Sequence, residues 1–242
     1  MFGLSFMISA KSKQMRRDKA KYAALLDRQP SKHKKSFSNT EKVQQVCLAI
    51  ATDVALKGEG CLIVVGKTNS YSELFPNFFE KSNSNVLDKG MDKVLVQLAQ
   101  IDGAIVVDPK GEVQAYGVRV TKSTSHHGSG TRHSAAKGIS EEKGILAILA
   151  SEEDHVVRIF KSGQQVVEIN PNTKGIKNQL DKIVDFVNSP DGAVAAGAAI
   201  AIPLLGIPGV IVFAGSYYVA KKFGSFFKIA EAAKEKVAKR PH

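Results

Sequence analysis

The chain has 242 residues, of which 43% are hydrophobic and 24% are charged, and these fractions are ordinary for a globular protein. Its two cysteines, Cys47 and Cys61, form no C-x-x-C or Cys/His pattern, which argues against a disulfide framework or a zinc site and fits a reducing cytosol. The net charge of +11 is concentrated at the ends, because residues 1–35 carry +8 and residues 221–242 carry +5. Basic ends suit an anionic partner, either lipid headgroups or nucleic acid.

The first segment, residues 1–37, is predicted to be a basic N-terminal arm outside the folded domain. Its apolar start at residues 1–8 precedes the basic residues, which is the reverse of the order in a secretory signal. Residues 12–28 are expected to form a basic helix, and residues 30–35 a linker. A solvated tail is as good an interpretation of this arm as binding to an anionic surface.

Helix and strand patterns alternate from residue 38 to residue 170. Ser38 and Glu41 have the spacing of a capping box, which predicts a helix with one apolar face. That face comprises Val43, Val46, Cys47, Ile50 and Val54. Residues 61–65 form a continuous apolar run closed by Gly66, a pattern typical of a buried strand. Asp88 is expected to cap a second helix, which carries Val94, Leu95 and Leu98.

Five further strands are expected, at residues 103–108, 113–120, 145–151, 155–160 and 164–169. The turn sequence Pro109-Lys110-Gly111 predicts that the first two form a hairpin. Helices at the front and antiparallel pairs later predict an α/β fold with a mixed, twisted β-sheet flanked by helices.

Two short segments carry groups suited to chemistry. Asp102-Gly103-Ala104 places a carboxylate beside a glycine at the mouth of an expected strand. Residues 128–136 form a glycine-rich loop with a hydroxyl, a guanidinium and an imidazole at the start of an expected helix. Backbone donors and arginine neutralise phosphate, while a carboxylate holds a cation. Together the segments suit a nucleotide phosphate and a metal ion.

These segments resemble the DGA and RH motifs of the diadenylate cyclase domain family. The DGA triplet alone is weak, because Asp191-Gly192-Ala193 repeats it in this chain. More specific are Gly130-Thr131-Arg132-His133, which runs into Ala135-Ala136 and Gly138-Ile139-Ser140-Glu141, and the later segment Ala150-Ser151-Glu152-Glu153. The resemblance covers residues 57–165. It implies that two ATP molecules condense to cyclic di-AMP and two pyrophosphates across a face-to-face dimer.

The resemblance also implies a role for particular residues. Asp102 would activate the ribose 3′-hydroxyl and, with Glu153, ligate a divalent cation, Mg²⁺ or Mn²⁺. Gly103 would allow close backbone approach, and Arg132 would clamp phosphate in a bidentate manner. The implied catalytic residues are Asp102, Arg132 and His133. The implied nucleotide-binding residues are Gly103, Ala104, Thr131, Arg132, His133 and Ser151.

Plainer interpretations stay open for several of these residues. Asp102 has the position of an ordinary turn acid, and Arg132 with His133 has that of a solvated loop. His126 and His127 fit loop solvation better than metal binding, because no other ligands accompany them. Many family members carry a second arginine where this chain has Ser134, and its loss would weaken phosphate neutralisation. Lys122 and Lys137 are candidates to compensate.

The C-terminal part lies outside the resemblance. Residues 171–191 are expected to contain an amphipathic helix and a linker, with an apolar face formed by Ile176, Leu180, Ile183, Val184 and Val187. Residues 192–220 carry no charge and are predicted to be a helical, apolar, membrane-associated segment. Residues 221–242 form a basic tail suited to an interfacial helix on anionic lipid.

Three interpretations compete for the apolar segment. A single span would place Lys221 and Lys222 opposite a cytosolic domain, against the positive-inside tendency. A hairpin turning at residues 206–209 has arms too short to cross a bilayer, so it would be re-entrant or monotopic. A buried helical pair in a soluble oligomer is the third. We favour the re-entrant form.

The sequence therefore predicts a membrane-associated diadenylate cyclase with a cytoplasmic catalytic domain. The expected partners are ATP, a second copy of the chain and an anionic membrane surface. The alternative is a non-catalytic adenine-nucleotide sensor coupled to the membrane segment. Nucleic-acid binding ranks last, because no aromatic-lined basic sheet or known motif accompanies the basic arm.

Overall fold

The computed structural model describes residues 36–74, 84–124, 130–190, 200–203 and 207–214. The chain divides after residue 37 into two units, and the description below concerns the second, residues 38–242. Most of the basic arm, His126 and His127, and the basic tail lie outside the described residues.

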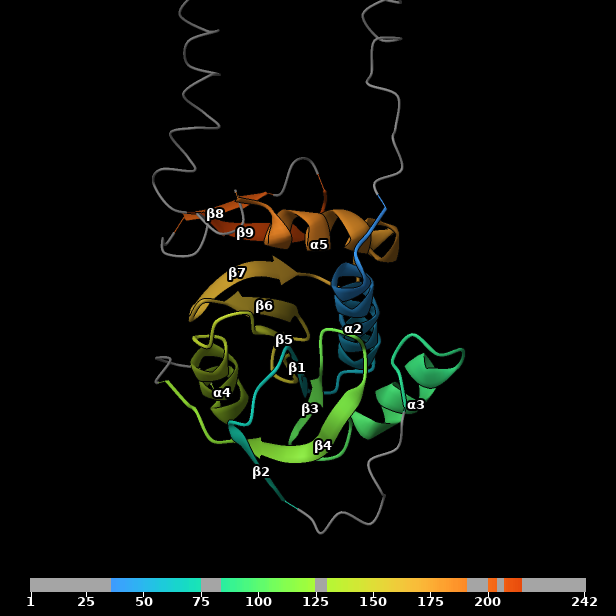
Figure 1. The fold of residues 1–242 in the computed structure, drawn as a ribbon. Coiled ribbons are helices and arrows are strands. Elements are labelled where there is room, and N and C mark those ends of the chain that lie inside the picture. Colours follow the sequence, from blue (N-terminus) through green and yellow to red (C-terminus); the bar gives the residue numbers. More distant parts are fainter. Residues whose placement is uncertain (1–35, 75–83, 125–129, 191–199, 204–206, 215–242) are drawn as a thin grey trace, which may run out of the picture. The chain divides into compact units, whose positions relative to one another are not determined.

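A mixed β-sheet of nine strands forms the centre of this unit (Figure 1). The strands are β1 (Cys61–Val65), β2 (Tyr71–Glu73), β3 (Ala104–Val107), β4 (Val113–Val120), β5 (Leu146–Ala150), β6 (Val157–Lys161), β7 (Gln164–Ile169), β8 (Ile200–Pro203) and β9 (Val210–Ala214). Their order is β2-β4-β3-β1-β5-β6-β7-β9-β8. Only β1 and β3 are parallel among these neighbouring pairs. The predicted α/β class with a mixed sheet is confirmed.

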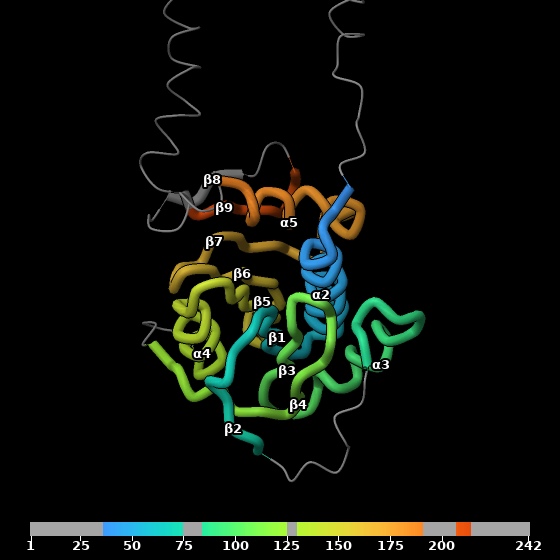
Figure 2. The backbone as a smooth tube through the Cα atoms, in the orientation of Figure 1, coloured from blue at the N-terminus to red at the C-terminus, as the bar shows by residue number. Residues whose placement is uncertain are grey.

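Helices cover both faces of the sheet. Ile63 and Val65 of β1 pack in a core with α2 (Asn39–Leu56), α3 (Met91–Leu98), the short 3-10 helix η1 (Ile176–Gln179) and α5 (Leu180–Asn188). Leu62 and Val64 point the other way, into a smaller core with α4 (Thr131–Ile139), because successive side chains of a strand alternate between faces. The backbone trace shows α2 and α4 on opposite sides of the sheet (Figure 2).

Local signals explain where the first two helices begin. Ser38 Oγ accepts from Glu41 N at 3.2 Å and Glu41 Oε2 accepts from Ser38 N at 2.7 Å, so the predicted capping box of α2 is confirmed. The prediction that Asp88 caps α3 is wrong, because Gly90 is the cap residue. Asp88 instead closes the preceding turn, where its Oδ2 accepts from Asn85 N at 3.2 Å.

The predicted hairpin of β3 and β4 is confirmed, and Asp108 holds its turn. Asp108 is buried, and its Oδ1 accepts from the backbone N of Lys110 at 2.8 Å and of Glu112 at 2.9 Å. Gly111 has φ +97°, a conformation that glycine adopts without strain. This hairpin fixes β4 beside the start of β3, where the predicted site lies.

The C-terminal segment corrects one prediction. The amphipathic helix is confirmed, because its five expected apolar residues are all buried. The helical prediction for residues 192–220 is wrong where the structure describes them, since residues 200–203 and 210–214 form an antiparallel strand pair. β9 pairs with β7 and buries Val210 and Val212, and branched residues such as these favour strands. Among the described residues, no helix has the length and apolar character to cross a membrane.

Candidate functional site

A cavity of about 500 Å³ opens between the sheet and the first turn of α4. It is lined by Leu62, Leu74, Asp102, Gly103, Ala104, Val118, Arg119, Val120, Ser123, Thr131, Arg132, Ser134 and Ala135. The volume lies in the range of small-molecule sites. Five of the predicted site residues thus meet here, three from the DGA segment and two from α4. His133, Ser151 and Glu153 are not among the lining residues.

The DGA segment meets the backbone of β4 at the cavity. Gly103 has φ +107°, and a Cβ there would lie 2.7 Å from Val118 N and 2.8 Å from Gly117 C. Any side chain would collide with the strand, so glycine is required at this position. Gly103 N donates to Asp102 Oδ1 at 3.0 Å, which orients the carboxylate at the rim. The Asp102 side chain is 79% exposed and is open to a ligand.

Arg132 joins three segments at the mouth of the cavity. Its Nη2 lies 3.6 Å from Asp102 Oδ1, and its Nη1 lies 3.3 Å from Glu152 Oε2. A Cβ on Gly60 would lie 2.7 Å from Arg132 Nη1, so the missing side chain of Gly60 makes room for the guanidinium. The sequence reasoning missed the contact with Glu152 and the role of Gly60. The apolar strand that follows Gly60 is the signal that could have drawn attention to it.

The first turn of α4 offers backbone donors beside Arg132. The helix begins after Gly130, which supplies no side-chain hydrogen bond to the cap. The first N–H groups of a helix lack partners within the helix, and together with the helix dipole they favour phosphate. Thr131, the first residue of the helix, is exposed and adds a hydroxyl to the cavity wall. This part of the site therefore suits an anionic ligand.

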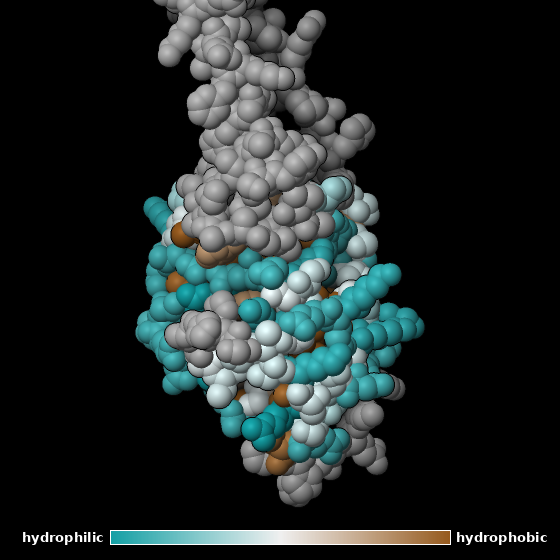
Figure 3. Space-filling model, turned by 90° about the vertical axis from the view of Figure 1, so that its left-hand side faces the viewer, coloured by the Kyte–Doolittle hydropathy of each residue, from teal (hydrophilic) through white to brown (hydrophobic). Residues whose placement is uncertain are grey.

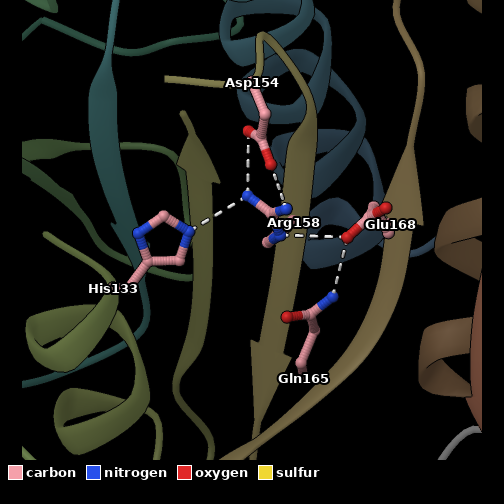
Figure 4. Close-up of polar contacts among 5 residues, drawn as sticks. All are labelled: His133, Asp154, Arg158, Gln165 and Glu168. Carbon is pink, nitrogen blue, oxygen red and sulfur yellow. Dashed lines mark hydrogen bonds and ion pairs between the residues drawn. The ribbon is translucent and has the colours of Figure 1, made fainter. Parts of the chain in front are cut away.

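His133 and Ser151 face a polar network in the interior. His133 is 7% exposed, and its Nε2 lies 3.0 Å from Nη1 of Arg158 on β6 (Figure 4). Arg158 also binds both carboxylate oxygens of Asp154. Burial raises the pKa of Asp154, but hydrogen bonds from Arg158 and from the Ser151 hydroxyl outweigh it and lower this pKa to about 2. No sequence pattern pointed to Arg158, which is a lone arginine in a strand.

Whether the site could hold a divalent cation depends on its acidic side chains. No three His, Cys, Asp or Glu side chains are grouped to hold a metal ion in the described ranges. Mg²⁺ needs only one or two carboxylates when substrate phosphates supply further oxygens. The exposed Asp102 carboxylate meets that need. Glu153 lies beside the start of α4, because a Cβ on Gly130 would be 3.5 Å from its Oε1.

Ser134, whose small side chain was expected to weaken phosphate neutralisation, lines the cavity. Lys122 is paired with Glu142 at 2.7 Å, and neither Lys122 nor Lys137 lines the cavity. A hydrogen bond from Lys122 lowers the pKa of Glu142, which keeps that pair charged.

The surface on the side of α4 is largely hydrophilic among the described residues, with only small separate hydrophobic areas (Figure 3).

The fold is an α/β domain whose cavity suits an anionic ligand, and comparison with known proteins points to its class. Residues 49–165 match the family model described as "DisA bacterial checkpoint controller nucleotide-binding". A diadenylate cyclase of Haloferax volcanii is 32% identical over an alignment of 140 residues, and the match covers 50% of this chain and 50% of the relative. A diadenylate cyclase of Methanocaldococcus jannaschii is 30% identical over an alignment of 124 residues, and the match covers 46% of this chain and 38% of the relative. Over residues 49–165 the chain is thus similar to the nucleotide-binding domain that this model describes, and two of its relatives are diadenylate cyclases.

Solved structures are more distant. A crystal structure of a double mutant of DacA from Staphylococcus aureus is 22% identical and has a TM-score of 0.44. That comparison covers 59% of this chain and 95% of the other. The chain matches half or less of the length of the two curated relatives.

Proposed function

We propose that this chain is a diadenylate cyclase, a nucleotidyltransferase that condenses two ATP molecules into cyclic di-AMP and two pyrophosphates. The observation that carries the proposal is the position of Arg132. This residue lies in the first turn of α4, and its guanidinium lies between the carboxylates of Asp102 and Glu152. The names of the two curated relatives, both diadenylate cyclases, support it. In this proposal residues 38–170 are the nucleotide-binding domain, and the segments 171–191 and 192–220 attach to it.

The proposed chemistry is in-line phosphoryl transfer between two facing sites. The 3′-oxygen of one ribose forms a bond to the α-phosphorus of the other ATP, while the bond from that phosphorus to pyrophosphate breaks. Asp102 accepts the hydroxyl proton at its carboxylate. Arg132 and the N-terminal turn of α4 neutralise phosphate charge, which is the main demand of such a transfer. Gly103 lets the nucleotide lie close to the backbone.

Residues outside the cavity lining have supporting roles in this scheme. Ser151 and His133 sit behind the phosphate-binding turn and hold it in place. A divalent cation, Mg²⁺ or Mn²⁺, would be held by Asp102 and Glu153 together with phosphate oxygens. When bound, such an ion neutralises phosphate charge and lowers the pKa of the hydroxyl it touches.

The test incubates the purified full chain with ATP and either Mg²⁺ or Mn²⁺ and analyses nucleotides by mass spectrometry. We expect cyclic di-AMP from the native chain and at least about a hundredfold less from Asp102→Asn, because the proton acceptor and a cation ligand are both weakened. Asp181→Asn is the matched control, since Asp181 is an exposed acid on α5, and it should keep native activity. ATP binding without product at any protein concentration would favour the sensor function instead.

We also propose that the protein works at an anionic membrane surface with its catalytic domain in the cytoplasm. The basic composition of residues 1–35 and 221–242 supports this location. Sedimentation with vesicles of phosphatidylserine and phosphatidylcholine, compared with phosphatidylcholine alone, tests it. Binding that requires the anionic lipid is expected, and equal recovery in the supernatant of both samples would refute the proposal.

A further inference from the structure

Arg158 contacts two segments of the candidate site although it belongs to neither motif. Its side chain is only 14% exposed and projects from β6, where it contacts His133 of α4 and Asp154 of the turn after β5 (Figure 4). Nη1 lies 3.0 Å from His133 Nε2 and 3.1 Å from Asp154 Oδ1, and Nη2 binds Asp154 Oδ2. Nε donates to Glu168 Oε2 on β7 at 3.0 Å. All three nitrogens of the guanidinium are therefore engaged.

The chemistry of arginine fixes the state of His133. A guanidinium only donates hydrogen bonds, so His133 Nε2 must be the acceptor. The neutral ring then carries its proton on Nδ1. His133 is also 7% exposed and absent from the cavity lining. It therefore acts on the cavity through the position of its helix, not by direct contact of Nε2 with a phosphate.

The two contacts of Arg158 lie directly behind the phosphate-binding groups. His133 follows Arg132 in the first turn of α4, and Asp154 follows Glu152 and Glu153 in the turn after β5. Ser151 closes that turn, because its N donates to Val156 O at 2.9 Å and its hydroxyl binds Asp154. Arg158 thus joins on the inner side the same two segments that Arg132 joins at the surface.

The inner connection is the stronger of the two. The contacts of Arg132 are 3.3 and 3.6 Å long and exposed, and such pairs contribute little in water. Arg158 is itself only 14% exposed, and it makes a bidentate pair with the half-exposed Asp154 and a second pair with Glu168, which is 24% exposed. Glu168 is held in turn by Gln165 Nε2 at 3.2 Å. The first turn of α4 is therefore held in position mainly by the contacts of Arg158, not by those of Arg132.

We propose that Arg158 is a positioning residue for the cyclase reaction. Through His133 and Asp154 it fixes the first turn of α4 against residues 151–154, and so places Thr131 and Arg132 for the α-phosphate. This inference rests on the proposed function.

The test compares the native full chain with Arg158→Met and Arg158→Lys. We expect Arg158→Met to lower kcat about tenfold to a hundredfold with a smaller change in KM, because Arg132 still reaches ATP but from a displaced turn. Arg158→Lys keeps one charged donor and should recover part of kcat. Unchanged kcat in a folded Arg158→Met chain that makes cyclic di-AMP would overturn the inference.

A second measurement needs no turnover. Nitrogen-15 spectra of the His133 ring, assigned by loss of its signals in His133→Gln, show which ring nitrogen carries the proton. The native ring should be protonated at Nδ1, and Arg158→Met should shift the proton toward Nε2 and speed amide exchange at residues 131–134 and 151–154. A native ring protonated at Nε2 would overturn the inference, whereas absence of cyclic di-AMP with the expected ring spectrum would contradict only the proposed function.

A third variant controls for misfolding. Arg158→Met leaves the carboxylates of Asp154 and Glu168 without their cation, which itself destabilises a protein. The triple variant Arg158→Met, Asp154→Asn, Glu168→Gln removes all three charges together and is expected to fold. It should show the same loss of kcat, and native kcat in this variant would overturn the inference.

Discussion

Gly103 shows how a single backbone position shapes the cavity. Its φ of +107° disfavours any residue with a side chain. A Cβ at this position would also lie only 2.7 Å from the backbone of β4. We predict that Gly103→Ala lowers the free energy of unfolding by about 1–3 kcal/mol, as forced backbone strain and displacement do, and that it reduces activity further. Urea unfolding measures the first effect and product formation the second.

Gly144 offers a matched control for this substitution. It has φ +84°, and nothing lies within 4 Å of a Cβ built on it. Gly144→Ala therefore carries the conformational strain without the collision, and it should be the milder change. Equal losses in the two variants would mean that the approach of β4 contributes nothing.

Cys47 and Cys61 make stability depend on pH on the alkaline side. Burial raises the pKa of both thiols from 9.0 to about 12. In the unfolded chain the thiols ionise near pH 9 while the folded chain keeps its protons, so stability falls as pH rises above that value. At pH 10 the loss is on the order of 1 kcal/mol per thiol.

The measurement compares urea unfolding at pH 8 and pH 10 for the native chain and for the double variant Cys47→Ala, Cys61→Ala. The variant should lose less stability between the two pH values, because it has no thiol to ionise. An identical pH dependence in both chains would count against this cause.

At the scale of elements, the capping box makes the start of α2 sensitive to one hydroxyl. Ser38→Ala removes the acceptor for Glu41 N and should cost about 1 kcal/mol of stability. Ser38→Asn keeps a side-chain acceptor and serves as the control, with a loss of only a few tenths of a kcal/mol expected. Thermal unfolding measures both, and a neutral Ser38→Ala would show that the cap contributes nothing.

Most elements were predictable because their signals are local. Residues 61–65 are a continuous run of apolar residues, and Pro109-Lys110-Gly111 is a turn sequence, so β1 and the β3–β4 hairpin follow from the sequence. β2 was missed because three residues on an edge carry almost no pattern. β8 and β9 were missed because an uncharged Ala- and Gly-rich segment is as compatible with a helix, and only pairing with β7 decides.

The residues of the site that belong to short motifs could also be predicted from the sequence. Asp102, Gly103 and Arg132 belong to short motifs, and the cavity brings them together. Arg158 contacts His133 although the two lie far apart in the sequence, and the register of β6 and β7 places Glu168 beside Arg158. No sequence pattern records such a contact. The catalytic roles themselves stay predictions.

At the scale of the whole molecule, the proposed reaction requires two chains, and mixing tests this. If each Asp102 activates the ribose bound in its own site, as proposed, a pair of one native and one Asp102→Asn chain should form only one of the two bonds. We expect the linear diadenylate to accumulate in the mixture at the expense of cyclic di-AMP. Mass spectrometry of the two products decides, and activity strictly proportional to the native fraction would contradict the two-chain scheme.

The strand pair at the C-terminal side alters how the chain can be shortened. β9 covers the open edge of β7, and its partner residues Ile207, Val210 and Val212 fill the core beneath α5. A chain cut after residue 191 would present a free, apolar strand edge, which invites aggregation. A segment whose composition resembles that of a membrane anchor thus covers a sheet edge through β9, and we expect its removal to promote association between copies of the chain.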